Sequence, residues 1–232
     1  MNTLIFSGKD FSDFSAQVTR STFLKGAEQD VTTFSVLGRN GVLVSSNNRF
    51  KPVSMTTELA VKGDMQANME AMRNFLAGCV GMCRYEESQT PNEYRMAMLS
   101  KAFNPDLYDH LSGTVKLDFT AQPQRWLKEG EIPIELDETG SLFNPTSQEA
   151  SPLIKVTGTG SFGIGNITVT ISEHPYDYLM IDCDAMLIYF NSFRAGDYVT
   201  MTNHEYPTLK PGDNNITIDG VTLEITPRWF NI

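Results

Sequence analysis

The residue pair with the clearest potential for chemistry is Asp182 and Asp184, on either side of Cys183. Carboxylate oxygens are the ligands that Mg²⁺ prefers, and a pair of this kind is typical of sugar-nucleotide enzymes that use a divalent metal. The preceding residues, Leu179 to Ile181, are typical of a strand, in which both aspartates would share one face. Solvent-facing carboxylates explain the same pattern, and no phosphate-binding glycine loop is evident nearby. A metal-dependent hydrolase or transferase is therefore kept as a minor hypothesis.

The remaining chemical motifs do not form a site. The three histidines lack the i, i+4 spacing of a helical metal site: His110, His174 and His204. Cys79 and Cys83 have no second cysteine pair with which to complete a zinc site. Two glycine-rich stretches, 158–160 and 163–165, are not followed by a helical pattern, so we expect turns or bulges there. With no Gly-x-Ser-x-Gly elbow either, the sequence predicts a protein that is not an enzyme, with no catalytic residue, metal site or cofactor.

Aromatic residues gather toward the C-terminal end of the chain. The cluster consists of Tyr176, Tyr178, Tyr189, Phe190, Phe193, Tyr198 and Tyr206. Aromatic faces on a β-sandwich can stack on sugar rings, so a carbohydrate-binding, lectin-like module is the second functional hypothesis. Core packing and protein contacts explain the same residues. Trp126 and Trp229 are likewise expected as core or interface anchors.

Composition excludes several classes of partner. The chain has 232 residues, of which 41% are hydrophobic and 20% charged, as in ordinary folded proteins. Its 28 acidic residues against 18 basic ones give a net charge of -10, which excludes nucleic-acid binding as the main function. No stretch approaches the roughly 18 apolar residues of a membrane span, and the first ten residues do not resemble a signal peptide. The cysteines are expected to be free thiols: Cys79, Cys83 and Cys183.

One segment has the pattern of a helix. Asp64 is a suitable N-cap, and Gly78 a suitable stop. Between them, apolar residues recur with helical spacing: Met65, Met69, Met72 and Leu76. The sequence predicts one helix, over about 65–77.

The rest of the chain has β patterns. Strands over 32–36 and 42–44 flank a polar connection at 38–41, and Asn47-Asn48 is expected to turn the chain again. Residues 114–120 alternate as in a half-buried antiparallel strand. The pattern breaks after Ala121 and resumes near Gly130, which predicts two domains, 1–130 and 131–232.

The second domain is predicted to be a small β-sandwich, because short strands follow one another with turn signals between them. The predicted strands cover 154–156, 166–171, 178–182, 187–189, 216–218 and 221–225. Asp219-Gly220 is the residue pair of a type I′ turn, so the last two strands are expected to form a hairpin with Ile218 opposite Val221.

The order of these features resembles the distal tail proteins of siphophages, the Dit family, over nearly the whole chain. In the first half, the resemblance rests on 37–43 (LGRNGVL), the predicted helix, 94–97 (YRMA) and 113–123 (GTVKLDFTAQP). In the second half it rests on 143–146 (FNPT), 151–160 (SPLIKVTGTG), 181–183 (IDC), 209–214 (LKPGDN) and 225–229 (ITPRW).

This resemblance implies a structural virion protein at the tail tip, assembled in the host cytoplasm. It implies a mainly β fold with a ring-forming N-terminal domain that carries one helix, and a galectin-like C-terminal β-sandwich. The ring would be hexameric and would serve as the hub for tail-tip or baseplate assembly. Its partners would be the tail tube, the tail-associated hub or fibre protein and, in some phages, receptor-binding proteins. From the net charge of -10 we also hypothesise that part of this acidic charge lines the lumen, so that DNA passes without specific binding.

Overall fold

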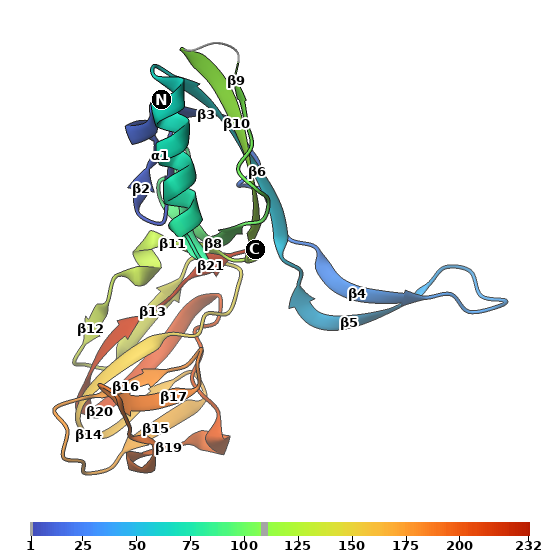
Figure 1. Ribbon diagram of the computed structural model, residues 1–232. Helices are drawn as coiled ribbons and strands as arrows, with labels where there is room; N and C mark the ends of the chain where they lie inside the picture. The colour runs from blue at the N-terminus through green and yellow to red at the C-terminus, as the bar shows by residue number, and fades with distance from the viewer. Residues whose placement is uncertain (1, 108–110) are drawn as a thin grey trace. The chain divides into compact units, whose positions relative to one another are not determined.

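The structure, a computed structural model, describes residues 2–107 and 111–232 (Figure 1). It contains two compact units, residues 1–125 with Ile232 and residues 126–231, which we call the first and second units. Within the described residues the fold is mainly β with a single α-helix in the first unit, which confirms the expected fold class. No helix in that part of the chain has the length and apolar character needed to span a bilayer.

The first unit is built on a curled antiparallel sheet with the strand order β2-β1-β7-β8-β10-β6-β3, and β9 pairs with β10. The backbone N–H of Val18 on β3 donates to the carbonyl of Asn2, just before β1, at 2.9 Å, so the two sides of the sheet approach each other. The strands are β1 (Leu4–Phe6), β2 (Lys9–Asp10), β3 (Ala16–Ser21), β6 (Val53–Lys62), β7 (Cys83–Glu87), β8 (Glu93–Leu99), β9 (Pro105–Leu107) and β10 (Ser112–Ala121).

The core of this unit follows the strand alternation seen in the sequence. β10 pairs along its whole length with β6 and buries Val115, Leu117 and Phe119, as predicted. The helix α1 (Met65–Gly78) begins at Asp64, whose side chain accepts the N–H of Ala67 at 3.1 Å. Its buried stripe is the predicted one: Met65, Met69, Met72 and Leu76. These side chains join one hydrophobic core with the inner face of the sheet.

A separate two-stranded sheet leaves the first unit between β3 and β6. We call it the arm, residues 29–50, made of β4 (Gln29–Phe34) and β5 (Leu43–Phe50). Two strands flanking the 38–41 connection were predicted, and both exist. The predicted turn at Asn47-Asn48 is wrong, because both residues lie within β5. Asn48 has a φ of 53° close to a register shift in the β4–β5 ladder, so the local signal marks a bulge rather than a turn.

The second unit is an antiparallel β structure with one hydrophobic core. Its sheet has the order β12-β20-β14-β16-β17-β18, with β13 on β20, β15 on β14 and β19 on β15. The strands are β12 (Ile134–Leu136), β13 (Gly140–Asn144), β14 (Leu153–Ile164), β15 (Ile167–Ile171), β16 (Leu179–Asp182), β17 (Leu187–Phe190), β18 (Phe193–Arg194), β19 (Val199–Met201) and β20 (Gly212–Thr226). Two short strands outside this sheet, β11 (Arg125–Leu127) and β21 (Phe230–Asn231), pair with each other.

The predicted hairpin at Asp219-Gly220 is wrong. Residues 212–226 form the single strand β20, and Asp219-Gly220 lies in its middle. Opposite this point, β14 has a register shift between Gly158 and Ser161. Gly160 has a φ of 150°, and a Cβ there would lie 2.1 Å from the carbonyl oxygen of Asp219. The positive φ of Gly220, which the sequence associates with a turn, serves a bulge in which the two backbones approach closely.

This bulge divides the two long strands into halves with different neighbours. Before the bulge, β14 pairs with β16, and the matching half of β20 pairs with β12. After it, β14 pairs with β15, and the other half of β20 pairs with β13. Buried side chains from both halves, including Ile154 and Ile164, meet in the same core. The long strands therefore contribute to both parts of the sheet that enclose the core.

Candidate assembly surface

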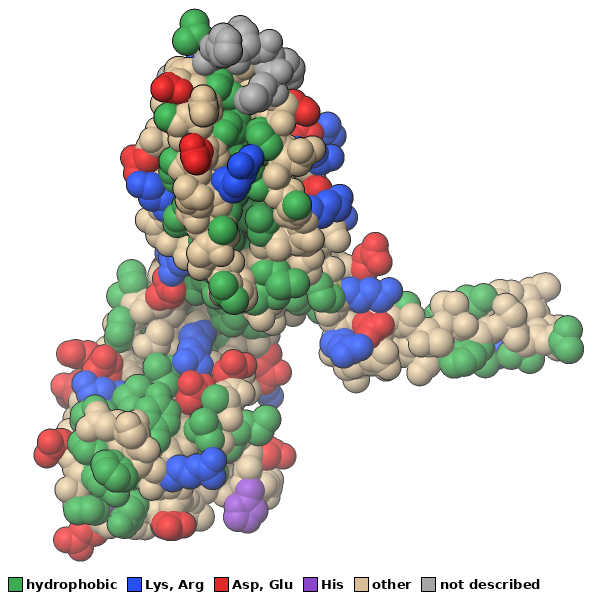
Figure 2. Space-filling view, viewed as in Figure 1, with side chains coloured by type: hydrophobic (Ala, Val, Ile, Leu, Met, Phe, Trp, Pro, Cys, Tyr) green, Lys and Arg blue, Asp and Glu red, His purple; other side chains and the backbone are tan. Residues whose placement is uncertain are grey.

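The arm carries an exposed apolar surface. Figure 2 shows hydrophobic side chains along it, and Leu37 near the tip is 102% exposed. The exposed large apolar residues of the arm are Phe34, Val36, Leu37, Val42, Leu43 and Val44. Phe34 lies opposite Leu43 in the β ladder, so the two form an apolar pair on one face. Contiguous exposed apolar surface of this kind is typical of an interaction site.

Among the residues that the structure describes, the arm packs against no other element. None of residues 28–52 is buried, and neither β4 nor β5 joins another sheet. A two-stranded hairpin is marginally stable alone in water, and both of its edges offer unpaired backbone groups. The arm therefore has the features of a segment that binds a partner molecule.

The root of the arm is closed by polar contacts. The N–H of Lys51 donates to the carbonyl of Glu28 at 2.8 Å, where the two strands leave the first unit. Farther out, the Arg49 guanidinium lies 2.6 Å from the Asp30 carboxylate. The hydrogen bond from Arg49 lowers the pKa of Asp30, which keeps this pair charged at neutral pH. The polar root and the apolar outer half thus have separate roles.

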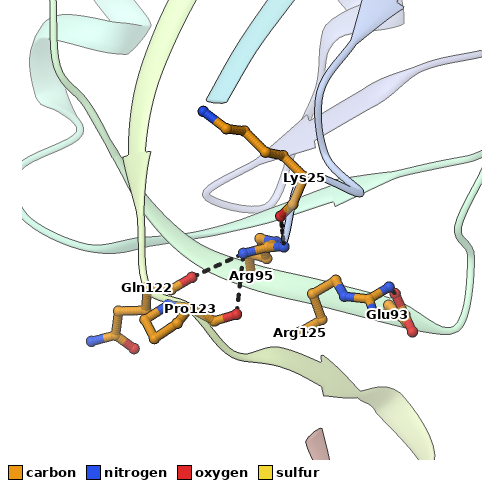
Figure 3. Close-up of polar contacts among 6 residues, drawn as sticks. All are labelled: Lys25, Glu93, Arg95, Gln122, Pro123 and Arg125. Carbon is orange, nitrogen blue, oxygen red and sulfur yellow. Dashed lines mark hydrogen bonds and ion pairs between the residues drawn. The ribbon is translucent and has the colours of Figure 1, made fainter. Parts of the chain in front are cut away.

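A buried arginine fixes the chain that leads into the arm (Figure 3). The side chain of Arg95, on β8, is fully buried. One of its terminal nitrogens, Nη2, donates to the carbonyl of Lys25 at 2.7 Å. The other, Nη1, donates to the carbonyls of Gln122 and Pro123 at 3.2 Å each. One side chain therefore joins the segment before the arm to the segment that follows β10.

Arg95 has no direct carboxylate partner among these bonds. Burial lowers its pKa to about 10, with nearby Arg125 lowering it further and Glu93 opposing both. Glu93 instead forms an ion pair with Arg125 at 3.1 Å, and Figure 3 shows these two side chains next to each other. The guanidinium of Arg95 still lies 5.7 Å from the ring centre of Phe23. At neutral pH it remains a buried cation that is held by carbonyl oxygens.

A pocket of about 430 Å³ lies beside the root of the arm. We call it the root pocket, lined by Ser21, Thr22, Phe23, Leu24, Lys25, Glu87, Gln89 and Thr90. Glu87 is 3% exposed, and its Oε1 accepts hydrogen bonds from the hydroxyls of Ser21 and Tyr85. Burial, and then the negative charge of Glu87, raise the pKa of Tyr85 well above its usual value. The pocket therefore has a fixed carboxylate in its wall.

The paired aspartates of the second unit have a structural role. Asp182 ends β16, whereas Asp184 lies in the following turn, so the expectation that both share one face of a strand is wrong. Asp182 Oδ1 accepts the N–H groups of Asp184 and Ala185, each at 3.1 Å. The guanidinium of Arg228 donates to both oxygens of Asp182, at 2.7 and 3.1 Å. Its carboxylate is thus committed to an ion pair and a turn.

Replacing Asp182 with asparagine should destabilise the second unit by about 2 kcal/mol, because the carboxylate charge is lost and an amide NH₂ then faces the guanidinium of Arg228. Burial raises the pKa of Asp182, but the bonds from Arg228 and the turn outweigh it and lower the pKa below its ordinary 3.8. A lowered folded-state pKa gives stability that is present above pH 3.8 and is lost as pH falls through the folded value.

The difference between wild type and Asp182→Asn should therefore be constant near neutral pH and shrink below about pH 4. Denaturant unfolding followed by tryptophan fluorescence measures it, since Trp126 and Trp229 both lie in the second unit. Asp184→Asn is the matched control and should change stability little. Equal effects of both variants at neutral pH would contradict this assignment.

The other sequence candidates are dispersed. All three cysteines are free thiols, and burial raises the pKa of Cys183 to about 12. His174 accepts the N–H of Tyr176 at 3.3 Å, His204 lies in an exposed turn, and His110 lies outside the described residues. Within the described ranges, no three His, Cys, Asp or Glu residues gather as metal ligands could.

The aromatic cluster packs largely on itself. Tyr176 stacks on Phe190 with ring centres 4.9 Å apart, and Tyr178 meets the same ring edge-on at 5.0 Å. Tyr198 meets Tyr176 edge-on at 5.8 Å. These rings are partly buried, and several pack against the core of the second unit. These contacts are typical of core packing, which was the alternative to a sugar-stacking surface. Trp229, 7% exposed, is a core residue as expected.

Comparison with known proteins relates this architecture to phage tails. No protein-family model and no curated protein matches the sequence. The SPP1 Dit protein, a paradigm of the hub adsorption apparatus in phages that infect Gram-positive bacteria, matches with a TM-score of 0.72 and 12% identity, over 97% of this chain and 98% of that chain. This chain has the Dit fold. A chain of the phage P2 baseplate, in its activated conformation with Ca, matches with a TM-score of 0.53 and 9% identity over 97% of both chains.

The Dit fold includes both units, since the match covers nearly the whole of each chain. The resemblance inferred from the sequence is thus confirmed at the level of the fold. Sequence reasoning found the two strands of the arm but not its isolation. The signal was available in the apolar residues on either side of 38–41, which alternate too little for a half-buried strand. Arg95 gave no such signal, because nothing in its sequence neighbourhood indicates a buried cation.

Proposed function

We propose that this protein is a structural component of a siphophage tail tip, the hub on which the tip or baseplate is assembled. The observation that carries the proposal is the match to the SPP1 Dit protein over nearly the full length of both chains. The sequence resemblance to distal tail proteins, which rests on short motifs in both halves of the chain, supports the same function independently. The protein acts in the virion by binding other proteins and catalyses no reaction.

The hub is a ring, hexameric in the family that the sequence resembles, formed by the first units. The arm supports this arrangement, because its apolar outer half and open strand edges need a partner. A contact between an arm and a different surface of the next copy is head-to-tail, and such contacts close only when their rotation divides the circle. The second units project from the ring toward the host-adhesion components.

The partners of the ring are the tail tube on one side and the tail-associated hub or fibre protein on the other, with receptor-binding proteins where a phage has them. The net charge of -10 per subunit suits a lumen through which DNA passes without adhering. Reversing acidic residues that face the lumen should slow DNA ejection. An unchanged ejection time would remove the role of charge but not the ring.

The mass of the full-length protein in solution tests the proposal. Light scattering should give about six times the subunit mass of 25.9 kDa, and negative-stain images should show rings. If the protein alone is monomeric, the same measurement is made after mixing it with the purified tail tube protein of its phage. A stable monomer under both conditions would contradict the function proposed here.

A further inference from the structure

The tip of the arm presents an unpaired cation. Arg39 lies in the connection between β4 and β5 and is exposed. It forms no side-chain hydrogen bond or ion pair with the residues that the structure describes, whereas Arg49 on the same arm pairs with Asp30. Leu37, close to it in sequence, is fully exposed. The tip thus offers a guanidinium beside an apolar side chain.

The root pocket has the complementary chemistry. Glu87 supplies a nearly buried carboxylate, and the buried hydroxyl of Thr90 has no hydrogen-bond partner. Phe23 and Leu24 supply apolar surface, of which Leu24 is 63% exposed. Lys25 also lines the pocket, but its ammonium lies 3.4 Å from the carbonyl of Ser54. A guanidinium has five N–H donors in a planar fork, enough to serve the carboxylate and the hydroxyl together.

The arm cannot fill its own root pocket. Residues 21–25 of the pocket lie immediately before the arm, whereas Arg39 lies at its far end. The strand β4 ends at Phe34, and even a fully extended chain from Gln29 to Val36 spans about 23 Å. A turn lies beyond it, in which the N–H of Arg39 donates to the carbonyl of Val36 at 3.1 Å. The rest of the first unit has about 100 residues, for which a compact shape gives a radius of gyration near 13 Å and a diameter of about 34 Å. With its turn and the long side chain of Arg39, the arm therefore reaches across most of one subunit width.

In a head-to-tail row of copies, equivalent points on neighbours are about one subunit width apart. An arm of that length that lies along the row brings its tip to the root of the next arm, where the next root pocket is. We propose that Arg39 of one copy binds in the root pocket of the next, with its guanidinium on Glu87 and Thr90 and with Leu37 against Leu24. This inference rests on the proposed ring and names the surface that closes it.

This contact between two copies also affects the next contact along the ring. Lys25, in the wall of the root pocket, has its carbonyl held by Arg95, and the chain continues from there into the arm. A bound arm tip therefore stabilises the segment that directs the arm of the receiving copy. Because the donor and acceptor surfaces differ, each copy can receive one arm while it extends its own.

Charge-neutral variants of the full-length protein test the pair. Arg39→Gln and Glu87→Gln should each raise the concentration needed for half-maximal assembly by about 30-fold or more, because one partner of a desolvated ion pair is lost. The double variant should be no weaker than either single variant. Arg49→Gln, the control on the same arm, should assemble like wild type. Circular dichroism checks that Glu87→Gln folds. If Glu87→Gln does not fold, the exposed variant Arg39→Gln still tests the pair.

Disulfide trapping locates the contact directly. Leu37→Cys protein mixed with Leu24→Cys protein, both lacking Cys79 and Cys83, should form a mixed dimer on mild oxidation. Leu37→Cys mixed with Glu70→Cys, on the exposed face of α1, is the control and should not. If arm deletion abolishes assembly but Arg39→Gln and Glu87→Gln do not weaken it and no Leu37–Leu24 dimer forms, this inference is wrong and the ring stands. A wild type that stays monomeric at every concentration, with or without tail tube protein, together with cysteine variants that give no cross-link, rejects both.

Discussion

Replacing Arg95 with methionine should destabilise the first unit by about 3 kcal/mol. Methionine retains an apolar stem of similar length but leaves the carbonyls of Lys25, Gln122 and Pro123 without their donor. A buried acceptor without a partner costs about 1–3 kcal/mol, and relief from burying a cation offsets part of the loss. Arg95→Lys should lie between, because an ammonium keeps the charge but cannot span all three oxygens.

Circular dichroism at the helix wavelength during urea unfolding measures this effect, because α1 belongs to the first unit. Tryptophan fluorescence, which reports on the second unit, should not change. Arg73→Met is the matched control, on the exposed face of α1 with its guanidinium 5.8 Å from the ring centre of Phe103, and it should lose no more than about 1 kcal/mol. A loss for Arg95→Met no larger than that for Arg73→Met would show that the carbonyl contacts contribute nothing.

Removing the arm should abolish assembly while the first unit stays folded. Because Lys51 donates to the carbonyl of Glu28, the two residues can be joined by an Asn-Gly turn in place of residues 29–50. No buried side chain is lost, so thermal stability should change by only a few degrees. The concentration for half-maximal assembly should rise at least about 100-fold, since each apolar side chain that leaves an interface forfeits about 1.5–3 kcal/mol.

A second pair of variants separates arm chemistry from arm length. Phe34→Ser with Leu43→Ser removes one cross-strand apolar pair from the outer half and should weaken assembly. Thr32→Ala with Ser45→Ala changes the polar pair two positions along the same ladder and should not weaken assembly. Light scattering across a dilution series reads out both. Unaltered assembly of the arm-deleted protein would show that assembly uses another surface.

Local patterns predicted those parts of the fold that are decided locally. The helix followed from its N-cap and its apolar spacing, and β10 followed from strict alternation against a single core. The hairpin at Asp219-Gly220 failed for a physical reason. The sequence reports that Gly220 needs a positive φ, but a type I′ turn and a bulge both supply that conformation. Only the pairing of β20 with the distant β14 decides between them.

The assembly surface was less predictable for the same reason. An apolar side chain in a strand, such as Phe34 or Val44, indicates burial whether its partner lies in the same chain or in another copy. The root pocket joins residues 21–25 with residues 87–90, which meet only because the sheet curls. The Arg95 bonds likewise connect positions 70, 27 and 28 residues away along the chain. Such contacts depend on tertiary structure and produce no periodic pattern in the sequence.

The two long strands of the second unit have a further consequence. Since β14 and β20 each run through both halves of the sheet, force or strain applied to one half passes along the backbone into the other. The halves cannot slide apart or melt one after the other without breaking the same ladder, which contains ten residue pairs. The second unit is therefore mechanically a single block, which would suit it to carry load in the proposed tail-tip hub.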